Sequence, residues 1–436
     1  MRKHLLLIMM TVLVAASLFG TGSQEAQSKH AGVQDQGNEL KVFVPQSPGI
    51  VEGVTAIAKV FMEKNPSKTV TVRSVPFGKY KEQLRVMWSS EEVDDVVTFA
   101  TVESPSWAYY GSLLPLDDIL PASEQAKFMS SAIESATYDG HIYSYPFRES
   151  CSAMYYNKAM FALAGIEPAT LDKPWTWEEW RTNILKVRNA VKQATGNEPW
   201  GLTFLTNPGQ GDFWITPIIR SNGKPGSNTY KAIADDGITL HGYADTPEAM
   251  EAYQFYQNLY TTDKLAPTAE VPDAFATGNA VTMVSFMSTG NLFKKQFPDL
   301  EWGVMPLPYF KTPITHTSGF AYSISAKTKV PHLAKEFVSF AASEEGTIIY
   351  FDKVGPDLLS RIDFADKHPE YYRDELSQAF IKILNTYGIA RPQTQAYTAY
   401  NNIMGFEMFK DIDLGADIPS TVERCMTKFE KQAKNM

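Results

Sequence analysis

The spacing of hydrophobic residues in the first part of the chain predicts strands that alternate with helices. The stretches 41–45, 69–77 and 94–100 are alternating or continuously apolar, which is typical of strands. Between them, residues 53–66 and 78–90 carry apolar side chains at helical spacing. This order predicts parallel strands joined by right-handed crossovers. We therefore expect an α/β fold.

Helical periodicity returns in the later part of the chain. Residues 174–196, 246–262 and 331–351 place apolar side chains on one helical face. The first of these helices follows Thr176, with Glu179 three residues further on, which is the pattern of a capping box. The α/β character is therefore expected to continue through the whole chain.

The loops that follow the first strands are candidates for a ligand site. In parallel sheets, ligands bind beyond the carboxyl ends of the strands. Those ends carry Gln46 and Ser47, then Tyr80, and then Thr101. The same residues also suit ordinary turns, so both interpretations stay open.

The N-terminal segment has the parts of a secretory signal peptide. Basic residues at 2–4 precede an apolar stretch at 5–18, and small residues follow. We predict a signal peptide at 1–22 and a flexible tether at 23–38, because the latter is polar and has no periodicity. Thr21 stands where a lipoprotein would carry its lipobox Cys. The protein is expected to be periplasmic or otherwise extracytoplasmic, whether the signal is cleaved or retained as an anchor.

Length, charge and composition narrow the possibilities. The chain has 436 residues, and the part after the tether exceeds what one hydrophobic core usually serves, so we expect two domains. The net charge of −9 argues against nucleic acid or an anionic membrane surface as a partner. Metal-ligand spacings and nucleotide motifs are missing from the sequence, so no metal and no cofactor are expected. Cys151 and Cys425 could pair in an oxidising compartment, which the sequence leaves open.

Seven segments, in order along the chain, carry a resemblance to a known family. They read GSLLPLDDIL, TYDGHIYSYPFRESCSAMYYNKAMFALAGI, PWTWEEW, TPEAMEAYQFYQNLY, FATGNAVTMVSF, FPDLEWGVMPLP and SGFAYSISAKTKVPHLAKEFVSFAASEEG. Over residues 40–400 the chain resembles the extracytoplasmic solute-binding proteins of ABC importers that bind sugars and oligosaccharides, the maltose-binding-protein-like family. It departs from them at SSEEVDDVV, which lacks the usual Gly and Pro, and in the loop from Pro45, which lacks the usual Trp or His.

The resemblance implies a two-lobed periplasmic-binding-protein fold. Each lobe would be a mainly parallel sheet flanked by helices, with a ligand cleft between the lobes and hinge segments that move on closure. Lobe one is expected at 39–148 plus 304–350, and lobe two at 149–303 plus 351–436. The chain would cross between the lobes near 147–149, 302–305 and 351–355.

A sugar site combines aromatic rings, which cover the C–H faces of the sugar, with planar polar side chains, which bind its hydroxyls. The resemblance, together with the rule for strand ends, indicates a set of ligand-binding residues from both lobes. They are Gln46, Ser47, Tyr80, Thr101, Trp107, Arg148, Glu149, Tyr155, Asp212, Trp214, Phe286, Ser288, Gly319, Phe320, Arg391 and Tyr397.

Some of these residues have a second interpretation. Trp107 could anchor a helix in the core. Arg148 and Glu149 could form a hinge salt bridge instead of contacting ligand. Tyr155 and Tyr156 are neighbours on a predicted strand and point to opposite faces, so one of them belongs to the core.

The resemblance implies a binding protein and not an enzyme. A monomer would close on a sugar or oligosaccharide and deliver it to the permease subunits of an ABC transporter. Three alternatives remain, one of which is a purely structural or adhesive surface protein. The same fold could bind a peptide, a polyamine or an anion. An exported glycoside hydrolase would need two carboxylates roughly 5 to 9.5 Å apart; Glu103, Glu149 and Asp212 are candidates, but no spacing in the sequence pairs them.

Overall fold

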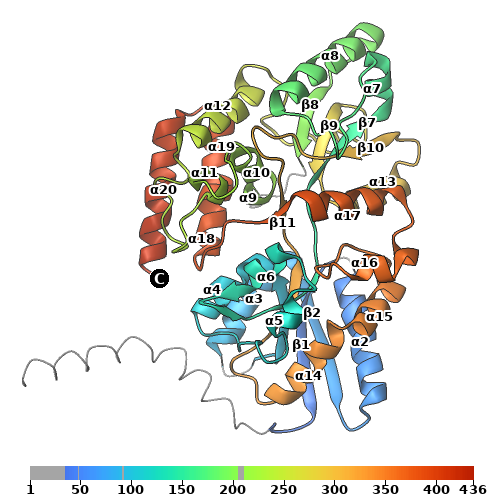
Figure 1. Cartoon of the computed structure of the whole chain (residues 1–436), viewed down its shortest axis with the longest axis vertical. Coiled ribbons are helices and arrows are strands. Elements are labelled where there is room, and N and C mark those ends of the chain that lie inside the picture. The colour runs from blue at the N-terminus through green and yellow to red at the C-terminus, as the bar shows by residue number, and fades with distance from the viewer. Residues whose placement is uncertain (1–34, 48, 91–92, 205–210) are drawn as a thin grey trace, which may run out of the picture.

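The computed structural model describes residues 35–47, 49–90, 93–204 and 211–436, which form two α/β bodies arranged along the long axis of the molecule (Figure 1). One body contains a five-stranded sheet and the other a four-stranded sheet. The predicted signal peptide lies outside the described residues, as does most of the predicted tether.

The described chain is part of the fold from its first residue. Asp35 lies in the predicted tether, yet its carboxylate accepts hydrogen bonds from the backbone N–H groups of His332 and Leu333, both at 2.9 Å. These donors belong to the first turn of α14 and lack partners within the helix. Residues 35–38 are therefore attached to the first body instead of serving as a tether.

The first sheet has the strand order β2-β1-β3-β12-β6. Strands β1, β2 and β3 are parallel and are connected through α2 and α3, which confirms the predicted alternation. Helices α14 and α15 pack beside α2 (Figure 1). The bounds are β1 (Glu39–Gln46), α2 (Ile50–Lys64), β2 (Thr69–Pro76), α3 (Phe77–Ser89), β3 (Val96–Ala100), η1 (Thr101–Glu103), α4 (Ser104–Tyr109), α5 (Ala122–Gln125), α6 (Ser130–Ala136), β4 (Thr137–Tyr138), β5 (His141–Ile142), β6 (Tyr145–Arg148), β12 (Phe320–Ile324), α14 (Pro331–Ala341), α15 (Glu344–Val354), α16 (Phe364–Lys367) and η2 (Pro369–Tyr371).

The second sheet has the strand order β10-β7-β9-β8. The capping box predicted at Thr176 and Glu179 is present at the start of α8. The bounds are β7 (Ala153–Asn157), α7 (Lys158–Ala164), α8 (Trp177–Thr195), β8 (Trp200–Phe204), α9 (Gly211–Trp214), α10 (Thr216–Arg220), α11 (Asn228–Lys231), α12 (Pro247–Thr261), β9 (Ala280–Ser285), α13 (Met287–Gln296), β10 (Trp302–Met305), β11 (Thr315–Thr317), α17 (Glu375–Tyr387), β13 (Gly388–Ala390), α18 (Tyr397–Asn402), η3 (Ile403–Glu407), α19 (Met408–Asp413) and α20 (Ile418–Lys434).

The sheets are less parallel than predicted. In the second sheet, β7 is antiparallel to both β9 and β10, and β8 is parallel to β9. In the first sheet, β12 is antiparallel to both β3 and β6. Strands β6, β7, β10 and β12 adjoin the connections between the two bodies. A helical crossover within one body makes successive strands parallel. A strand that enters a body from the other body has no such crossover before it, so it can be antiparallel.

Three segments connect the two bodies. The first joins β6 to β7, the second joins β10 to β12 through β11, and the third leads from η2 to α17. Single β-bridges join Arg148 to Leu359 and Cys151 to Thr317. The first and second connections therefore lie side by side at the junction of the bodies.

Packing also bears on the lobe boundaries expected from the sequence. Val304 and Met305, expected in lobe one, pair with β7 of the second sheet. Phe351, Phe364 and Tyr372, expected in lobe two, pack in the core of the first sheet. The lobe division stays a prediction, but this packing favours boundaries further along the chain at both places.

Both cysteines are buried as free thiols, Cys151 at the junction and Cys425 in α20. A disulfide between them is therefore not formed. Among the described residues, none of the helices is both long enough and apolar enough to cross a membrane.

The junction depends on the missing side chain of Gly319, which offers a direct test. A Cβ atom at Gly319 would lie 1.8 Å from the carbonyl oxygen of Arg148. We expect Gly319→Ala to lower the free energy of unfolding by about 2 kcal/mol or more, because backbone must move to make room. Urea denaturation measures this change. A Cβ at Gly78, in α3, meets nothing within 4 Å, so Gly78→Ala should be neutral or stabilising. Equal stability of both variants would contradict this account of the junction.

Candidate ligand-binding site

A buried ion pair between Asp212 and Arg391 forms the centre of the candidate site. Asp212 lies in α9 with none of its surface exposed, and Arg391 directly follows β13. The Nε atom of Arg391 donates to Oδ2 of Asp212 at 3.0 Å, and a second guanidinium nitrogen donates to the same oxygen. A third donates to the hydroxyl of Ser318 at 3.1 Å. A buried charge pair needs such additional hydrogen bonds to offset its desolvation.

Tyr397, at the start of α18, completes the centre. Its hydroxyl donates to Oδ2 of Asp212 at 3.2 Å and accepts from the guanidinium of Arg391. The other carboxylate oxygen of Asp212, Oδ1, is buried and has no hydrogen-bond partner among the described residues. A buried acceptor normally has a donor. This oxygen is therefore suited to accept a hydrogen bond from a hydroxyl of a bound molecule.

Two glycines allow Asp212 to approach the C-terminal segment. A Cβ atom at Gly211 would lie 1.7 Å from the carbonyl oxygen of Gly405, and one at Gly405 would lie 3.0 Å from the backbone nitrogen of Asp212. Gly405 belongs to η3, a turn of π-helix. Such turns are frequent at functional sites. Here the turn packs against the backbone that carries the carboxylate.

His316 and Arg220 support both ends of the ion pair. Nδ1 of His316 lies 2.7 Å from the carbonyl oxygen of Asp212, and Nε2 lies 2.8 Å from a guanidinium nitrogen of Arg220. Because a carbonyl only accepts and a guanidinium only donates, Nδ1 carries the proton. Burial, followed by Arg220 and Arg391, lowers the pKa of His316 well below its usual value, so the ring is neutral. Arg220 also donates to the carbonyl of Ala390 at 2.7 Å.

Glu149 adds a second buried carboxyl group at the junction. Its side chain is buried, and the backbone N–H of Ser150 donates to it at 3.2 Å. Burial raises the pKa of Glu149 to about 8, although Ser150 and the charge of Arg391 act in the opposite direction. At neutral pH this group is therefore mostly protonated and able to donate a hydrogen bond.

Aromatic rings lie beside the ion pair. The guanidinium of Arg391 lies 5.4 Å from the centre of the Phe213 ring. The ring of Phe286 lies 5.0 Å from that of Phe213 and 4.4 Å from that of Trp214. Together, the charged, hydroxyl and aromatic groups can bind both the polar and the apolar surfaces of a small molecule.

The first body also contacts this centre. The backbone N–H of Tyr397 donates to the hydroxyl of Ser106 in α4 at 3.2 Å. Lys81, from α3, lies 5.7 Å from the centre of the Tyr397 ring and pairs with the buried Glu103 at 2.8 Å. The site is therefore built by both bodies.

The predicted residues fall into two groups. Asp212, Arg391 and Tyr397 are in direct contact, and Glu149 interacts electrostatically with Arg391. Five other predicted residues lie next to residues of this group, either along the chain or in contact with a neighbour of it. They are Thr101, Trp214, Phe286, Gly319 and Phe320. Thr101 donates its backbone N–H to the carbonyl of Gly319 at 2.9 Å. Residues 205–210, just before the helix that carries Asp212, lie outside the described residues.

Three predicted aromatic residues occupy hydrophobic cores. The hydroxyl of Tyr80 donates to the carbonyl of Phe43 at 2.8 Å, and that of Tyr155 donates to the carbonyl of Phe286 at 2.6 Å. Trp107 packs 4.4 Å from Trp88, between ring centres. Backbone carbonyls accept from the two hydroxyls, and the indole of Trp107 packs among apolar neighbours while its Nε1 has no hydrogen-bond partner among the described residues. The core interpretation thus describes Trp107 and Tyr155, and ligand contact by these residues stays a prediction.

The polar predictions at Gln46, Ser47 and Ser288 lie at or near the surface. Gln46 and Ser288 are exposed, and Ser47 is half-buried. The amide of Gln46 lies 3.4 Å from the hydroxyl of Ser74. Contact between these side chains and a ligand stays a prediction.

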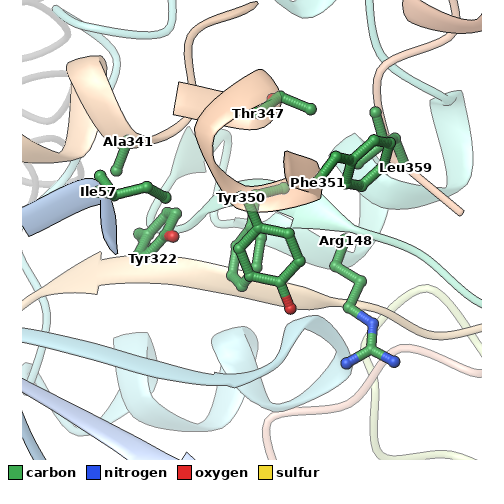
Figure 2. A pocket seen from close by; sticks show the side chains of 9 residues that line it. Ile57, Arg148, Tyr322, Ala341, Thr347, Tyr350, Phe351 and Leu359 are labelled. Atoms are coloured by element: carbon green, nitrogen blue, oxygen red, sulfur yellow. The ribbon is translucent and has the colours of Figure 1, made fainter. Parts of the chain in front are cut away.

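The position of Arg148 agrees with its second interpretation, a salt bridge at the hinge. Its guanidinium pairs with Asp357, which lies between α15 and α16. It also lines a small apolar cavity with Tyr322, Tyr350 and Leu359 (Figure 2). The cavity has about 10 Å³ of accessible space, room for one water molecule. Arg148 therefore forms a hinge salt bridge beside the first core.

His316, Arg220, Phe213 and Ser318 were missed from the sequence. The contacts of His316 with Arg220 and Asp212 span 96 and 104 residues of chain, and that of Ser318 with Arg391 spans 73. The signal that could have found Ser318 is its position beside Gly319, in the same junction segment.

The chain belongs to the bacterial extracellular solute-binding protein family, whose model matches residues 46–348. The family predicted from the sequence is thereby confirmed, and membership implies an extracytoplasmic location. Members of this family are binding proteins.

Known relatives agree with this assignment. Binding proteins of Brucella abortus are 25% identical over 285 residues, and the match covers 62% of this chain and 62% of the length of those relatives. The diacetylchitobiose binding protein of Streptomyces coelicolor is 24% identical over 340 residues, 74% of each chain. The crystal structure of the cyclic α-maltosyl-1,6-maltose binding protein of Arthrobacter globiformis superposes with a TM-score of 0.75 at 18% identity, covering 92% of this chain and all of that one. The two-lobed fold is therefore confirmed.

Glu149 predicts a measurable pH dependence of stability. Its folded pKa of about 8 lies above the ordinary value of 4.5, so the folded state holds more protons between these values. The contribution of Glu149 to stability therefore falls as the pH rises through this range. Urea denaturation at a series of pH values should show a steeper loss for the unaltered chain than for Glu149→Gln, which cannot ionise.

Glu63→Gln, at an exposed position of α2, serves as the control for that experiment. It should follow the unaltered chain at every pH. Parallel curves for Glu149→Gln and the unaltered chain would show that Glu149 is ionised in the fold at neutral pH.

Proposed function

We propose that this protein captures a carbohydrate between its two lobes and delivers it to the permease of an ABC transporter. The observation that carries the proposal is the buried Oδ1 of Asp212, which has no partner among the described residues and lies beside Arg391 and Tyr397. A sugar hydroxyl is a donor of the right kind for this oxygen, and the adjacent rings suit the C–H face of a pyranose.

The relatives support a carbohydrate as the ligand class. One is named for diacetylchitobiose and the structural neighbour for a cyclic maltosyl-maltose. Both are oligosaccharides with uncharged hydroxyl groups. The shared chemistry of these ligands fits a site whose carboxylate accepts and whose protonated Glu149 donates.

Closure is the proposed mechanism. A ligand that binds Asp212 and Arg391 on one lobe and groups near Ser106 on the other favours the closed arrangement of the lobes. The closed protein then presents surfaces of both lobes to the permease. The connections at Glu149 and Gly319 absorb the change in backbone angles.

The remaining parts of the proposal follow from this role. The protein acts as a monomer without metal or cofactor, performs no catalysis, and does not bind nucleic acid. A signal peptide at 1–22 directs its export.

Ligand screening tests the ligand class. Melting temperatures are measured with millimolar mono- and oligosaccharides, with spermidine and with short peptides, because a ligand at about 100 times its dissociation constant stabilises by about 2.7 kcal/mol. We expect a shift with one class of carbohydrate. A shift with spermidine or a peptide, and with none of the sugars, would replace carbohydrate as the ligand class.

Substitution at the ion pair tests the site. Asp212→Asn should weaken binding of the identified sugar about 10- to 100-fold, since it alters a buried acceptor and leaves Arg391 without its countercharge. The matched control is Asp263→Asn, because Asp263 also accepts two hydrogen bonds from one arginine, Arg181. Isothermal titration calorimetry should give an unchanged affinity for the control. Equal affinities for both variants would remove Asp212 from the site.

A further inference from the structure

Three tyrosines form an aromatic cluster at the surface of the first lobe, here called the aromatic rim: the exposed Tyr109 and Tyr110 and the half-buried Tyr138. Tyr109 and Tyr110 are 40% and 56% exposed. The ring of Tyr109 lies 5.3 Å from that of Tyr110 and 6.3 Å from that of Tyr138, with the planes close to perpendicular in both pairs. Single exposed aromatic residues are ordinary, but a cluster of adjacent rings forms an apolar patch that can bind a ligand.

The rim is continuous with the candidate site. Ser106, whose hydroxyl accepts the backbone N–H of Tyr397, also accepts the backbone N–H of Tyr110 through its carbonyl, at 3.3 Å. Residues four apart lie on the same face of a helix. Tyr110 therefore lies one turn beyond the point where the first lobe touches Tyr397.

A second contact places the rim at the edge between the lobes. Arg85, from α3, donates to the hydroxyl of Thr398 in α18 at 3.3 Å. The charge of Arg85 also acts on Tyr110, whose pKa is raised first by burial and then by Tyr109. Figure 1 shows α18 of the second lobe directly opposite α3 and α4. The rim therefore lies on the part of the first lobe that faces α18, the helix that begins with Tyr397.

The hairpin that carries Tyr138 is part of the same surface. Its turn holds Asp139 at a φ of +48°, followed by Gly140 at +77°. Both residues are exposed. The rim thus combines aromatic rings with the charged groups of Arg85 and Asp139. The buried site likewise combines aromatic rings with an arginine and an aspartate.

We infer that the aromatic rim binds the outer units of an oligosaccharide whose inner unit occupies the site at Asp212, Arg391 and Tyr397. The inference rests on the proposed function and adds to it that the ligand is an oligosaccharide, selected by its length. The outer sugar places its C–H face on Tyr110 and its hydroxyls near Arg85 and Asp139. Stacking of this kind contributes through buried apolar area and needs no closure of the lobes around the outer units.

Chain-length series test the inference. Affinities are measured by calorimetry for glucose and its α-1,4-linked oligomers of two to five units, and for the corresponding N-acetylglucosamine and arabinose series. Tyr109→Ala/Tyr110→Ala should weaken binding of the longer members of the series that binds by about 3- to 10-fold. The shortest member that binds should keep its affinity. Tyr110→Phe, which retains a ring, should bind all members like the unaltered chain.

Leu414→Ala serves as a control for loss of exposed apolar surface, since Leu414 is 66% exposed in the second lobe. It should change no affinity. The inference is overturned if the unaltered chain binds short and long members equally, or if the double variant weakens all members alike or none. If no member of any series binds the unaltered chain while spermidine or a peptide does, the proposed function fails and this inference falls with it. Loss of transport with unchanged sugar affinities would instead assign the rim to the permease.

Discussion

The buried ion pair between Asp212 and Arg391 is the interaction on which the candidate site depends. Two opposite charges without access to water are costly unless their hydrogen bonds are nearly complete. Ser318 and Tyr397 supply part of this set, and His316 fixes the backbone of Asp212. One carboxylate oxygen is left without a protein partner in the described part of the chain. A ligand hydroxyl would complete the set, so the cost of burial becomes a source of specificity.

The ion pair is also tied to the connections between the lobes. Arg391 follows β13, which pairs in parallel with β11. Strand β11 carries His316 and leads through Ser318 into β12 of the first sheet. Glu149, from the first connection, is near enough for the charge of Arg391 to affect its pKa. A displacement of Asp212 or Arg391 therefore acts directly on two of the three connections between the lobes. This gives a physical path from ligand contact to lobe closure.

The sequence revealed the fold and part of the site. Periodicity located the βαβαβ unit, and the resemblance located Asp212, Arg391 and Tyr397, which lie in direct contact. Local pattern could not show which way an aromatic side chain after a strand would point, so it did not reveal that Tyr80 and Trp107 pack in the core. Ligand contact by these two residues stays a prediction. The tautomer of His316 depends on partners 96 and 104 residues away, and no local pattern contains such contacts.

The balance of charge at the site favours an uncharged ligand. Asp212 and Arg391 neutralise each other, His316 is neutral, and Glu149 is mostly protonated at neutral pH. The remaining charge, on Arg220, is directed to protein acceptors, namely His316 and the carbonyls of Tyr230 and Ala390. A polyamine would find no free carboxylate among these groups, and an anion would have to compete with Asp212 for Arg391. A polyhydroxyl ligand needs neither, because it can donate to Asp212 and accept from Glu149 at once.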